Sequence, residues 1–215
     1  MVFTGHEFAD GADKITKTLQ QENIKASFFF TGDFYRNRSF KKIISNLIKK
    51  GHYLGAHSDK HLLYCDWNNR DSLLLSKTLF SIDIIDNYFT MAGFGNKMME
   101  KEYFLPPYEW YNDTIAAWTN EMGLQLINFT PGTRSNADYT TPDEKNYRSS
   151  DEIYKSIIQF EQEKPSGLNG FILLLHIGTD PKRTDKFYQH LPELIKYLEA
   201  KGYHFQTVEQ LLETD

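Results

Sequence analysis

The chain has 215 residues, of which 40% are apolar and 25% are charged, so it can bury a substantial core. Acidic residues outnumber basic ones by 29 to 24, and the net charge of −5 argues against nonspecific nucleic-acid binding and against docking on an anionic membrane. The single cysteine, Cys65, excludes an internal disulfide and a thiolate metal cluster. The longest apolar run, residues 171–175, is strand-sized, and no basic and apolar leader precedes residue 2, so we expect neither a membrane span nor a signal peptide in this chain.

Short apolar runs predict strands at residues 2–4, 26–31, 53–56, 103–105, 124–129, 171–176 and 204–208. Helical patterns lie between them, at residues 13–20, 40–49, 72–89, 112–122, 150–162 and 185–201. Asn112 and Ser150 are predicted to cap two of these helices, and Gly51 and Gly202 to end two others. Strands that alternate with helices predict an α/β fold with parallel strands, as a barrel or a doubly wound sheet. We expect residues 1–215 to form one domain, whether or not it belongs to a longer chain.

One stretch, residues 130–149, shows no apolar periodicity and is rich in Pro, Gly and Asn. A loop of this length inside a compact domain is usually functional or mobile. In α/β folds, chemistry gathers where the strands end, and His6, His57, His61 and His176 all follow or close predicted strands. These four histidines are therefore the first candidates for a site.

His57 and His61 are four residues apart. On one helical turn, this spacing would place both imidazoles on the same face, within reach of one metal ion. Ser58 could orient one of the rings. The alternative interpretation is two surface histidines on a loop.

Residues 55–61 (GAHSDKH) resemble the H-[S/T]-x-x-H metal motif of the polysaccharide deacetylases, also called the NodB-homology domain or carbohydrate esterase family 4. Residues 26–32 (ASFFFTG) look like the second strand of that family, and residues 51–55 (GHYLG) look like the approach to its metal motif. Residues 104–108 (FLPPY) are similar to its R-x-P-[Y/F] region, and residues 172–176 (ILLLH) to its last motif. The resemblance spans nearly the whole chain, which looks like a divergent member.

The resemblance implies a distorted (β/α)7-type barrel and a divalent metal held by two histidines and an aspartate. It also implies hydrolysis of an N- or O-acetyl group on a polysaccharide, in which a metal-bound water attacks the acetyl carbonyl. His57 and His61 would then be metal ligands. Zinc is the expected ion, with nickel, cobalt and manganese as alternatives.

The chain departs from the family at its first motif, which is T-F-D-D in the family and reads FTGHE at residues 3–7 here. His6 falls at the metal-binding Asp, and imidazole is an ordinary zinc ligand, so a three-histidine site is expected. The alternative is that His6 is only a polar residue at a strand end. Gly5 falls at the catalytic base, and Leu105 replaces the arginine that orients that base. This double absence fits either a rewired site or a decayed one.

An active site would need another base within hydrogen-bond reach of the attacking water. Glu7 and Glu109 are the preferred candidates because both follow strand ends. Asp10 and Asp59 are further candidates, although each of these carboxylates, taken alone, is more simply a solvated or helix-capping charge.

His176 matches the histidine of the family's last motif, which protonates the leaving group, and Leu174 matches the residue that lines the acetyl-methyl pocket. The alternative for His176 is a core histidine at the end of a strand. Asp180 could orient its ring, and Asp138 and Asp143 of the 130–149 loop are candidates for the acidic partner that the family implies.

Aromatic side chains in the loops at the predicted strand ends could stack on sugar rings, although several must simply pack: Trp67, Tyr108, Trp110, Tyr111, Tyr139 and Tyr147. Of these, Tyr108, Trp110 and Trp67 are the predicted substrate-binding residues. Lys182 and Arg183 could contact an acidic sugar, but two exposed basic residues are the simpler explanation.

Three functions remain open at this point. The first is a metal-dependent deacetylase acting on a polysaccharide or oligosaccharide such as xylan, chitin oligomers or peptidoglycan. The second is a catalytically inactive relative that serves as a carbohydrate-binding or structural module. The third is a hydrolase of another C–N bond that uses the same site. Polysaccharides are met mostly outside the cytoplasm, so a periplasmic or secreted location is expected.

Overall fold

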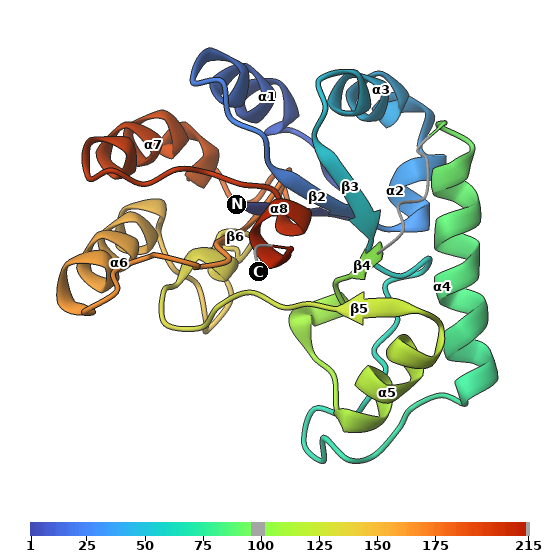
Figure 1. Ribbon diagram of the computed structural model, residues 1–215. Coiled ribbons are helices and arrows are strands. Elements are labelled where there is room, and N and C mark those ends of the chain that lie inside the picture. Colours follow the sequence, from blue (N-terminus) through green and yellow to red (C-terminus); the bar gives the residue numbers. More distant parts are fainter. Residues whose placement is uncertain (96–101, 214–215) are drawn as a thin grey trace. The chain divides into compact units, whose positions relative to one another are not determined.

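The computed structural model describes residues 1–95 and 102–213, and the chain divides into two compact units (Figure 1). The first unit contains Met1–Ser27, Gly51–Tyr53 and Phe129–Asp215, and the second contains Phe28–Lys50 and Leu54–Asn128. Each unit contains parallel strands with helices packed beside them.

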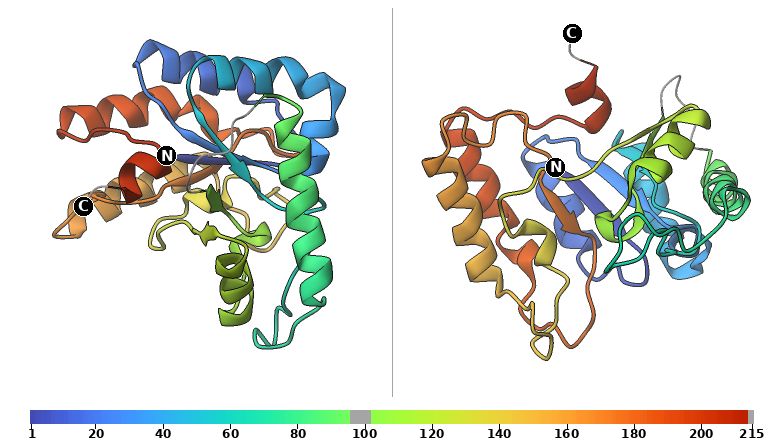
Figure 2. Two further views of the ribbon diagram at one scale, coloured as in Figure 1. Left: turned by 45° about the vertical axis from the view of Figure 1, so that its right-hand side comes forward. Right: turned by 90° about the horizontal axis from the view of Figure 1, so that it is seen from below.

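Two parallel strands form the centre of the first unit, β1 (Val2–Gly5) and β6 (Leu174–His176). Their register pairs Val2 with Leu174 and Thr4 with His176, so both strands end at the same edge. The helices of this unit are α1 (Ala12–Gln21), α6 (Ser150–Glu163), α7 (Leu191–Ala200) and the short α8 (Val208–Leu212), seen from two further sides in Figure 2. Buried leucine and isoleucine side chains of α1 and α7 complete its core, because both helices have one apolar face.

Four strands form the second unit in the order β5-β4-β3-β2, namely β2 (Ser27–Phe30), β3 (Tyr53–Ala56), β4 (Glu102–Phe104) and β5 (Leu124–Leu126). The helices are α2 (Gly32–Arg36), α3 (Lys41–Lys49), α4 (Lys77–Ala92) and α5 (Asp113–Glu121). The His57 amide donates to the Phe30 carbonyl at 3.2 Å, and the Leu105 amide donates to the Ala56 carbonyl at 3.2 Å. The residues that follow β3 and β4 are thereby held at one edge of the sheet.

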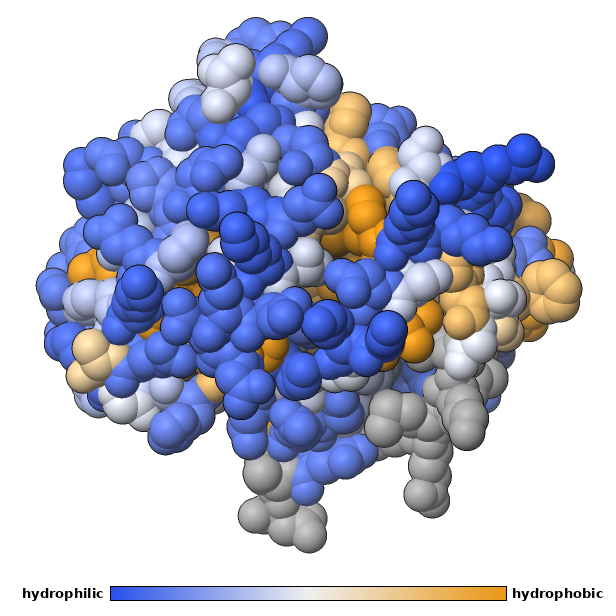
Figure 3. All heavy atoms as spheres, turned by 90° about the horizontal axis from the view of Figure 1, so that it is seen from above, coloured by the Kyte–Doolittle hydropathy of each residue, from blue (hydrophilic) through white to orange (hydrophobic). Residues whose placement is uncertain are grey.

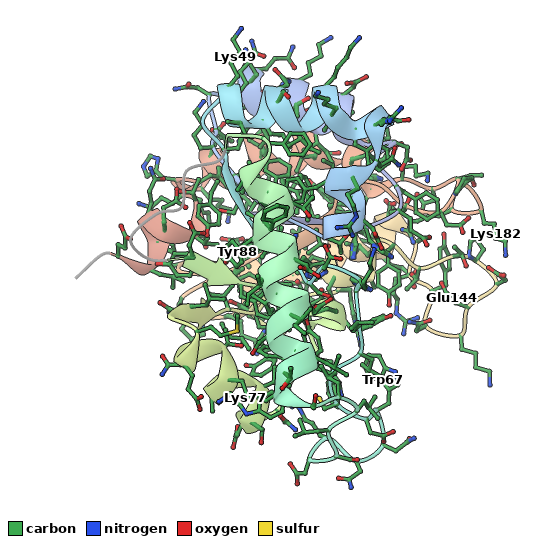
Figure 4. All side chains as sticks on the ribbon, turned by 90° about the vertical axis from the view of Figure 1, so that its right-hand side faces the viewer. Lys49, Trp67, Lys77, Tyr88, Glu144 and Lys182 are labelled. Atoms are coloured by element: carbon green, nitrogen blue, oxygen red, sulfur yellow. The ribbon has the colours of Figure 1, made fainter. Side chains whose placement is uncertain are left out.

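Helix α4 buries polar side chains and exposes apolar ones. Asp83 and Asn87 are buried, whereas four large apolar side chains are 48–80% exposed on its outer face: Leu79, Ile82, Ile85 and Phe89. Figure 4 shows this helix from the side. The buried amide of Asn87 accepts from the His57 amide at 2.9 Å and donates to the Phe30 carbonyl at 3.2 Å. The polar face of α4 therefore supports the residues that follow β3.

The surfaces of α1 and α3 are hydrophilic. The space-filling view in Figure 3 shows a mostly hydrophilic surface with separate apolar patches. Exposed lysines account for much of this character: Lys14 and Lys17 on α1, and Lys41, Lys42 and Lys49 on α3. Across residues 1–95 and 102–213, no helix is long and apolar enough to cross a membrane.

The 130–149 segment is anchored by a buried arginine. Arg183 is fully buried, and its guanidinium donates to the carbonyls of Thr140 (2.6 Å) and Arg148 (2.9 Å) and to the Ser150 hydroxyl (3.2 Å). A buried cation is stable only where such acceptors surround it. The simpler sequence interpretation, that Arg183 is an exposed basic residue, is wrong, whereas the side chain of Lys182 is 69% exposed.

The predicted α/β class with parallel strands is confirmed, and six of the seven predicted strands form in the described parts of the chain. The strand predicted at residues 204–208 is wrong, because α8 begins at Val208, where the Thr207 amide donates to Gln210 Oε1 at 3.3 Å. Three helix starts also differ from the prediction, and one of them is that of α7, which begins at Leu191 rather than at residue 185. Ser149, rather than Ser150, caps α6 through a capping box with Glu152, and α4 begins after the cap residue Ser76 rather than at residue 72.

Replacing Arg183 by methionine should lower the free energy of unfolding by about 2–4 kcal/mol, because buried carbonyl oxygens would lose their donors. The matched control Lys182→Met should change it by less than about 0.5 kcal/mol, since that side chain is exposed. Urea unfolding followed by circular dichroism measures both values. Equal, small losses in the two variants would contradict the anchoring role of Arg183.

Candidate functional site

His57 lies directly after β3 in the second unit and is buried. Its ring Nδ1 lies 2.7 Å from the Leu105 carbonyl oxygen. A carbonyl can only accept, so Nδ1 carries the proton and donates it. In the neutral ring, Nε2 then holds the lone pair that a metal would use, which is the arrangement typical of metal-binding histidines.

His61 lies close to His57, but not through a helical turn. Ser58 (φ 72°) and His61 (φ 55°) adopt the left-handed backbone conformation that residues other than glycine rarely adopt. The segment bends back, and the centroids of the two imidazole rings lie 5.1 Å apart. The expected helical geometry is therefore wrong, although the two rings are neighbours.

Polar contacts from α2 and α4 hold the 57–61 segment. Asp59 is buried and accepts two hydrogen bonds from the Arg36 guanidinium, at 2.6 and 2.9 Å. The hydrogen bonding that the Arg36 guanidinium donates to Asp59 is the largest reason that the pKa of Arg36 is raised. The Lys60 amide donates to Asp83 at 3.0 Å. A Cβ atom at Gly32 would lie 1.7 Å from Asp59 Oδ1, so only glycine fits there. Asp59, a candidate base from sequence, thus has a structural role.

The turn after β4 is strained at two consecutive residues. Tyr108 (φ 58°) and Glu109 (φ 54°), in the short 3-10 turn η2 (Pro107–Glu109), both adopt the left-handed conformation. Strain of this kind is characteristic of functional sites. The turn places the Tyr108 ring 4.4 Å from the His61 ring, and Glu109 is half-buried.

The three predicted substrate-binding aromatics of this unit lie together with His61. Trp67 lies 5.4 Å from Tyr108 and 5.5 Å from Trp110, measured between ring centroids. Trp67 is 52% exposed and Tyr108 is 45% exposed. His61, Tyr108, Trp67 and Trp110 form a continuous row of rings, which we call the aromatic shelf.

His6 and Glu7 follow β1 in the first unit. Nε2 of His6 lies 4.0 Å from Oε1 of Glu7, and Glu7 is exposed. Leu174 is fully buried in β6, opposite Val2. The roles predicted for His6, Glu7 and Leu174 stay predictions.

His176 ends β6 and is held by Asp138 of the 130–149 segment. Oδ1 of Asp138 lies 2.6 Å from ring Nδ1 of His176, and Oδ2 accepts from the His176 amide at 2.9 Å. Asp138 itself is buried. Both oxygens of one buried carboxylate therefore fix a single histidine. The suggestion that Asp180 orients this ring is wrong, because Asp180 Oδ1 instead accepts from the Lys182 amide.

Asp10, another candidate base, also has a structural role. It accepts from the Thr179 amide (2.7 Å) and the Tyr188 hydroxyl (3.0 Å), and its Oδ2 lies 3.0 Å from Lys186 Nζ. Burial of the carboxyl opposes its ionisation, but the contacts with Thr179, Lys186 and Tyr188 outweigh burial and lower the pKa of Asp10 below 3.8.

His57 and His61 are the described residues that could hold a divalent metal ion together. In residues 1–95 and 102–213, no group of three or more His, Cys, Asp or Glu side chains is arranged to hold a metal ion. The His57–His61 pair supplies two imidazoles, and imidazole is a preferred ligand of zinc and of neighbouring transition metals. The pair supplies two of the three donors that the sequence resemblance implies for the metal.

Comparison with known proteins identifies the family. Residues 5–127 match the family described as polysaccharide deacetylase, and the chain belongs to that family. A peptidoglycan-N-acetylglucosamine deacetylase of Bacillus cereus is 26% identical over 210 residues, which cover 95% of this chain and 85% of that protein.

Solved structures share the fold. A peptidoglycan N-acetylglucosamine deacetylase superposes with a TM-score of 0.76 at 18% identity, covering 100% of this chain and 87% of that one. A carbohydrate esterase family 4 pseudoenzyme from Bacillus anthracis superposes with a TM-score of 0.71 at 17% identity. This chain is covered over 99% of its length and spans 65% of the pseudoenzyme.

Sequence analysis missed the supporting residues. Asp83 and Asn87 lie four residues apart in the apolar stretch of α4, so they share one face of the helix. Two polar residues on the face that packs against the core could have indicated a supporting role. Arg70, whose guanidinium lies 4.2 Å from the Trp110 ring, gave no local signal, because the two residues are far apart in the chain.

Asp10→Asn should weaken folding at neutral pH by about 1 kcal/mol and much less in acid. The folded-state pKa of Asp10 is lower than its unfolded value of 3.8, so this stabilisation is present above pH 3.8 and disappears as the pH falls through the folded pKa. The difference in unfolding free energy between wild type and variant, measured from pH 7 to pH 2.5, tests this. For the control Asp86→Asn, at an exposed position of α4, the difference in unfolding free energy from wild type should not change as the pH falls. A difference that is constant with pH would contradict the assignment.

Proposed function

We propose that this chain is a metal-dependent hydrolase that removes acetyl groups from a polysaccharide or oligosaccharide. The observation that carries the proposal is the two-point contact between the buried Asp138 carboxylate and His176. Burial of a carboxylate costs solvation free energy. We take this cost as a sign that His176 must keep one orientation and one tautomer. Membership of the polysaccharide deacetylase family supports the reaction type.

His57 and His61 would hold the metal, with His6 as the proposed third ligand. The Leu105 carbonyl fixes the His57 ring so that Nε2 is its ligand atom. When bound, a divalent metal would polarise the acetyl carbonyl and increase the acidity of water. Zinc is the proposed ion, with nickel, cobalt and manganese as alternatives. A cobalt complex has been solved for the acetyl xylan esterase of Clostridium thermocellum, a fold relative of this chain.

His176 would donate the proton that the leaving amine or alcohol needs. Asp138 holds the proton on Nδ1, which directs Nε2 toward the reacting group, and the carboxylate stabilises the charged imidazolium before it donates. Asp138 thus acts through His176 and is a positioning residue.

The base is proposed to be Glu7 or Glu109, because Gly5 supplies no side chain. Glu109 follows the strained Tyr108 in the unit that contains His57 and His61, and Glu7 follows His6 in the other unit. Both carboxylates follow strand ends, where the resemblance places the chemistry.

Substrate contacts are proposed for the exposed rings of Tyr108, Trp67 and Trp110, since aromatic faces stack on the apolar faces of sugars. Leu174 is proposed to line the acetyl pocket. The Bacillus cereus relative is described as acting on peptidoglycan, so a glycan outside the cytoplasm, and a periplasmic or secreted location, are proposed for this chain.

A second candidate function is an inactive carbohydrate-binding or structural module. Gly5 and Leu105, in place of the base and its arginine, favour it, and so does the fold shared with a family 4 pseudoenzyme. A mutant of that pseudoenzyme is described as having restored enzymatic activity, so the same fold occurs in an inactive and an active form. The retained Asp138–His176 contact favours the active form here.

His57→Ala and His61→Ala should each reduce bound metal to well below one ion per chain, because one imidazole of a two-histidine donor set is lost. Elemental analysis of the dialysed protein measures the content, and circular dichroism checks folding. His204→Ala, which removes an exposed histidine, is the control and should keep the ion. Full metal content in both site variants would refute this metal site.

His176→Ala should keep its metal and lose turnover by about 10²–10⁴-fold, the usual contribution of a general acid. Asp138→Asn should lose a smaller part, because the ring remains but is held less firmly. Acetate release from acetylated xylan and chitin oligomers measures turnover. In the same assay, whichever of Glu7→Gln and Glu109→Gln removes turnover identifies the base. Unchanged turnover in His176→Ala would remove His176 from the mechanism.

A further inference from the structure

The aromatic shelf ends at an arginine that the function above does not use. From His61, the ring contacts continue through Tyr108 and Trp67 to Trp110. The Arg70 guanidinium lies 4.2 Å from the centroid of the Trp110 ring. The cation therefore stands at the end of the shelf that is furthest from the histidine pair along this row of contacts.

Arg70 is held in one orientation. Its Nε donates to the Tyr111 carbonyl at 2.5 Å, and its guanidinium also lies 5.4 Å from the Tyr111 ring. The Arg70 carbonyl accepts from the Asn112 side chain at 2.8 Å, and Asn112 caps α5. An arginine fixed in this way loses little conformational entropy when it binds a ligand.

The two Nη groups of Arg70 are not used by these contacts. Within residues 1–95 and 102–213 they donate to no protein atom, and the residue is exposed. A planar guanidinium with two available Nη groups matches a carboxylate with two hydrogen bonds. The neighbouring acid Asp66 accepts from its own loop amides, those of Asn68 and Asn69, both at 2.8 Å. Its Oδ1 is therefore occupied by backbone amides.

We propose that Arg70 binds the carboxylate of an acidic sugar unit in a glycan that lies along the aromatic shelf. This inference rests on the proposed function and names its substrate class, an oligosaccharide that contains a carboxylate-bearing unit. The net charge of −5 disfavours acidic ligands over the protein as a whole, so a fixed local cation is what such a ligand requires. A uronic acid and a sugar with a lactyl ether both carry this chemistry.

The test is a fluorescence titration, because Trp67 and Trp110 belong to the shelf and report binding without any turnover. The probes are two pairs: xylo-oligosaccharides with and without a glucuronic acid unit, and N-acetylglucosamine oligomers with and without N-acetylmuramic acid. Wild type should bind the acidic member of at least one pair about 10-fold more tightly than the neutral member, and the pair that shows this identifies the source. Salt should reduce the preference.

Arg70→Met should abolish the acidic preference and leave the affinity for neutral oligosaccharides within about twofold, because methionine removes the charge and keeps an unbranched apolar side chain at this position. Arg38→Met, at another exposed arginine, changes the net charge equally and should keep the preference. Arg70→Lys keeps the charge without the planar fork and should show an intermediate preference.

Equal wild-type affinity for both members of both pairs would overturn the proposal. So would an Arg70→Met variant that weakens neutral and acidic ligands equally, since Arg70 would then only support the shelf. If Arg70→Met does not fold, a wild-type preference that salt leaves unchanged overturns it as well. A salt-sensitive acidic preference without acetate release from any substrate would support Arg70 binding and instead refute the proposed hydrolase function.

Discussion

The site of the second unit depends on one hydrogen bond, from the His57 ring to the Leu105 carbonyl. It exists because β3 and β4 are adjacent and parallel, so the residues that follow them meet at one edge of the sheet. The bond sets the tautomer of His57 and so decides which nitrogen can bind a metal. Because the acceptor is a backbone carbonyl, this contact does not depend on which side chain stands at position 105.

Several polar groups are buried to keep the site residues in place. On α4, Asp83 and Asn87 occupy positions where apolar side chains would pack, and they bind the 57–61 segment and the end of β2. In the first unit, Arg183 anchors Thr140 and Arg148 on the segment that also carries Asp138. Each unit thus buries hydrogen-bonded polar groups that hold the segments on which these histidines and their partners lie.

Local signals in the sequence predicted six strands, the strand-end histidines and the family, because apolar runs and short motifs depend on neighbouring residues. Long-range contacts could not be predicted in the same way. The 130–149 segment has no periodicity, and its order comes from Arg183, more than thirty residues away, so Asp138 could be named only as one of two candidates. Ser58, His61 and Tyr108 adopt the left-handed backbone conformation, whereas the four-residue spacing of the histidines was interpreted on the geometry of a regular helix. The strand predicted at residues 204–208 does not form, because α8 begins at Val208 within that range.

The central claim is that a metal held by His57 and His61 is required for removal of acetyl groups from a glycan. The most direct measurement is acetate release by the purified chain from acetylated xylan and chitin oligomers, together with its metal content, before chelation, after chelation and after zinc is restored. The account predicts about one ion per chain, acetate release that stops when the ion is removed, and recovery with zinc. Release that continues unchanged in the metal-free protein, or no release from any acetylated glycan by the metal-loaded protein, would contradict it.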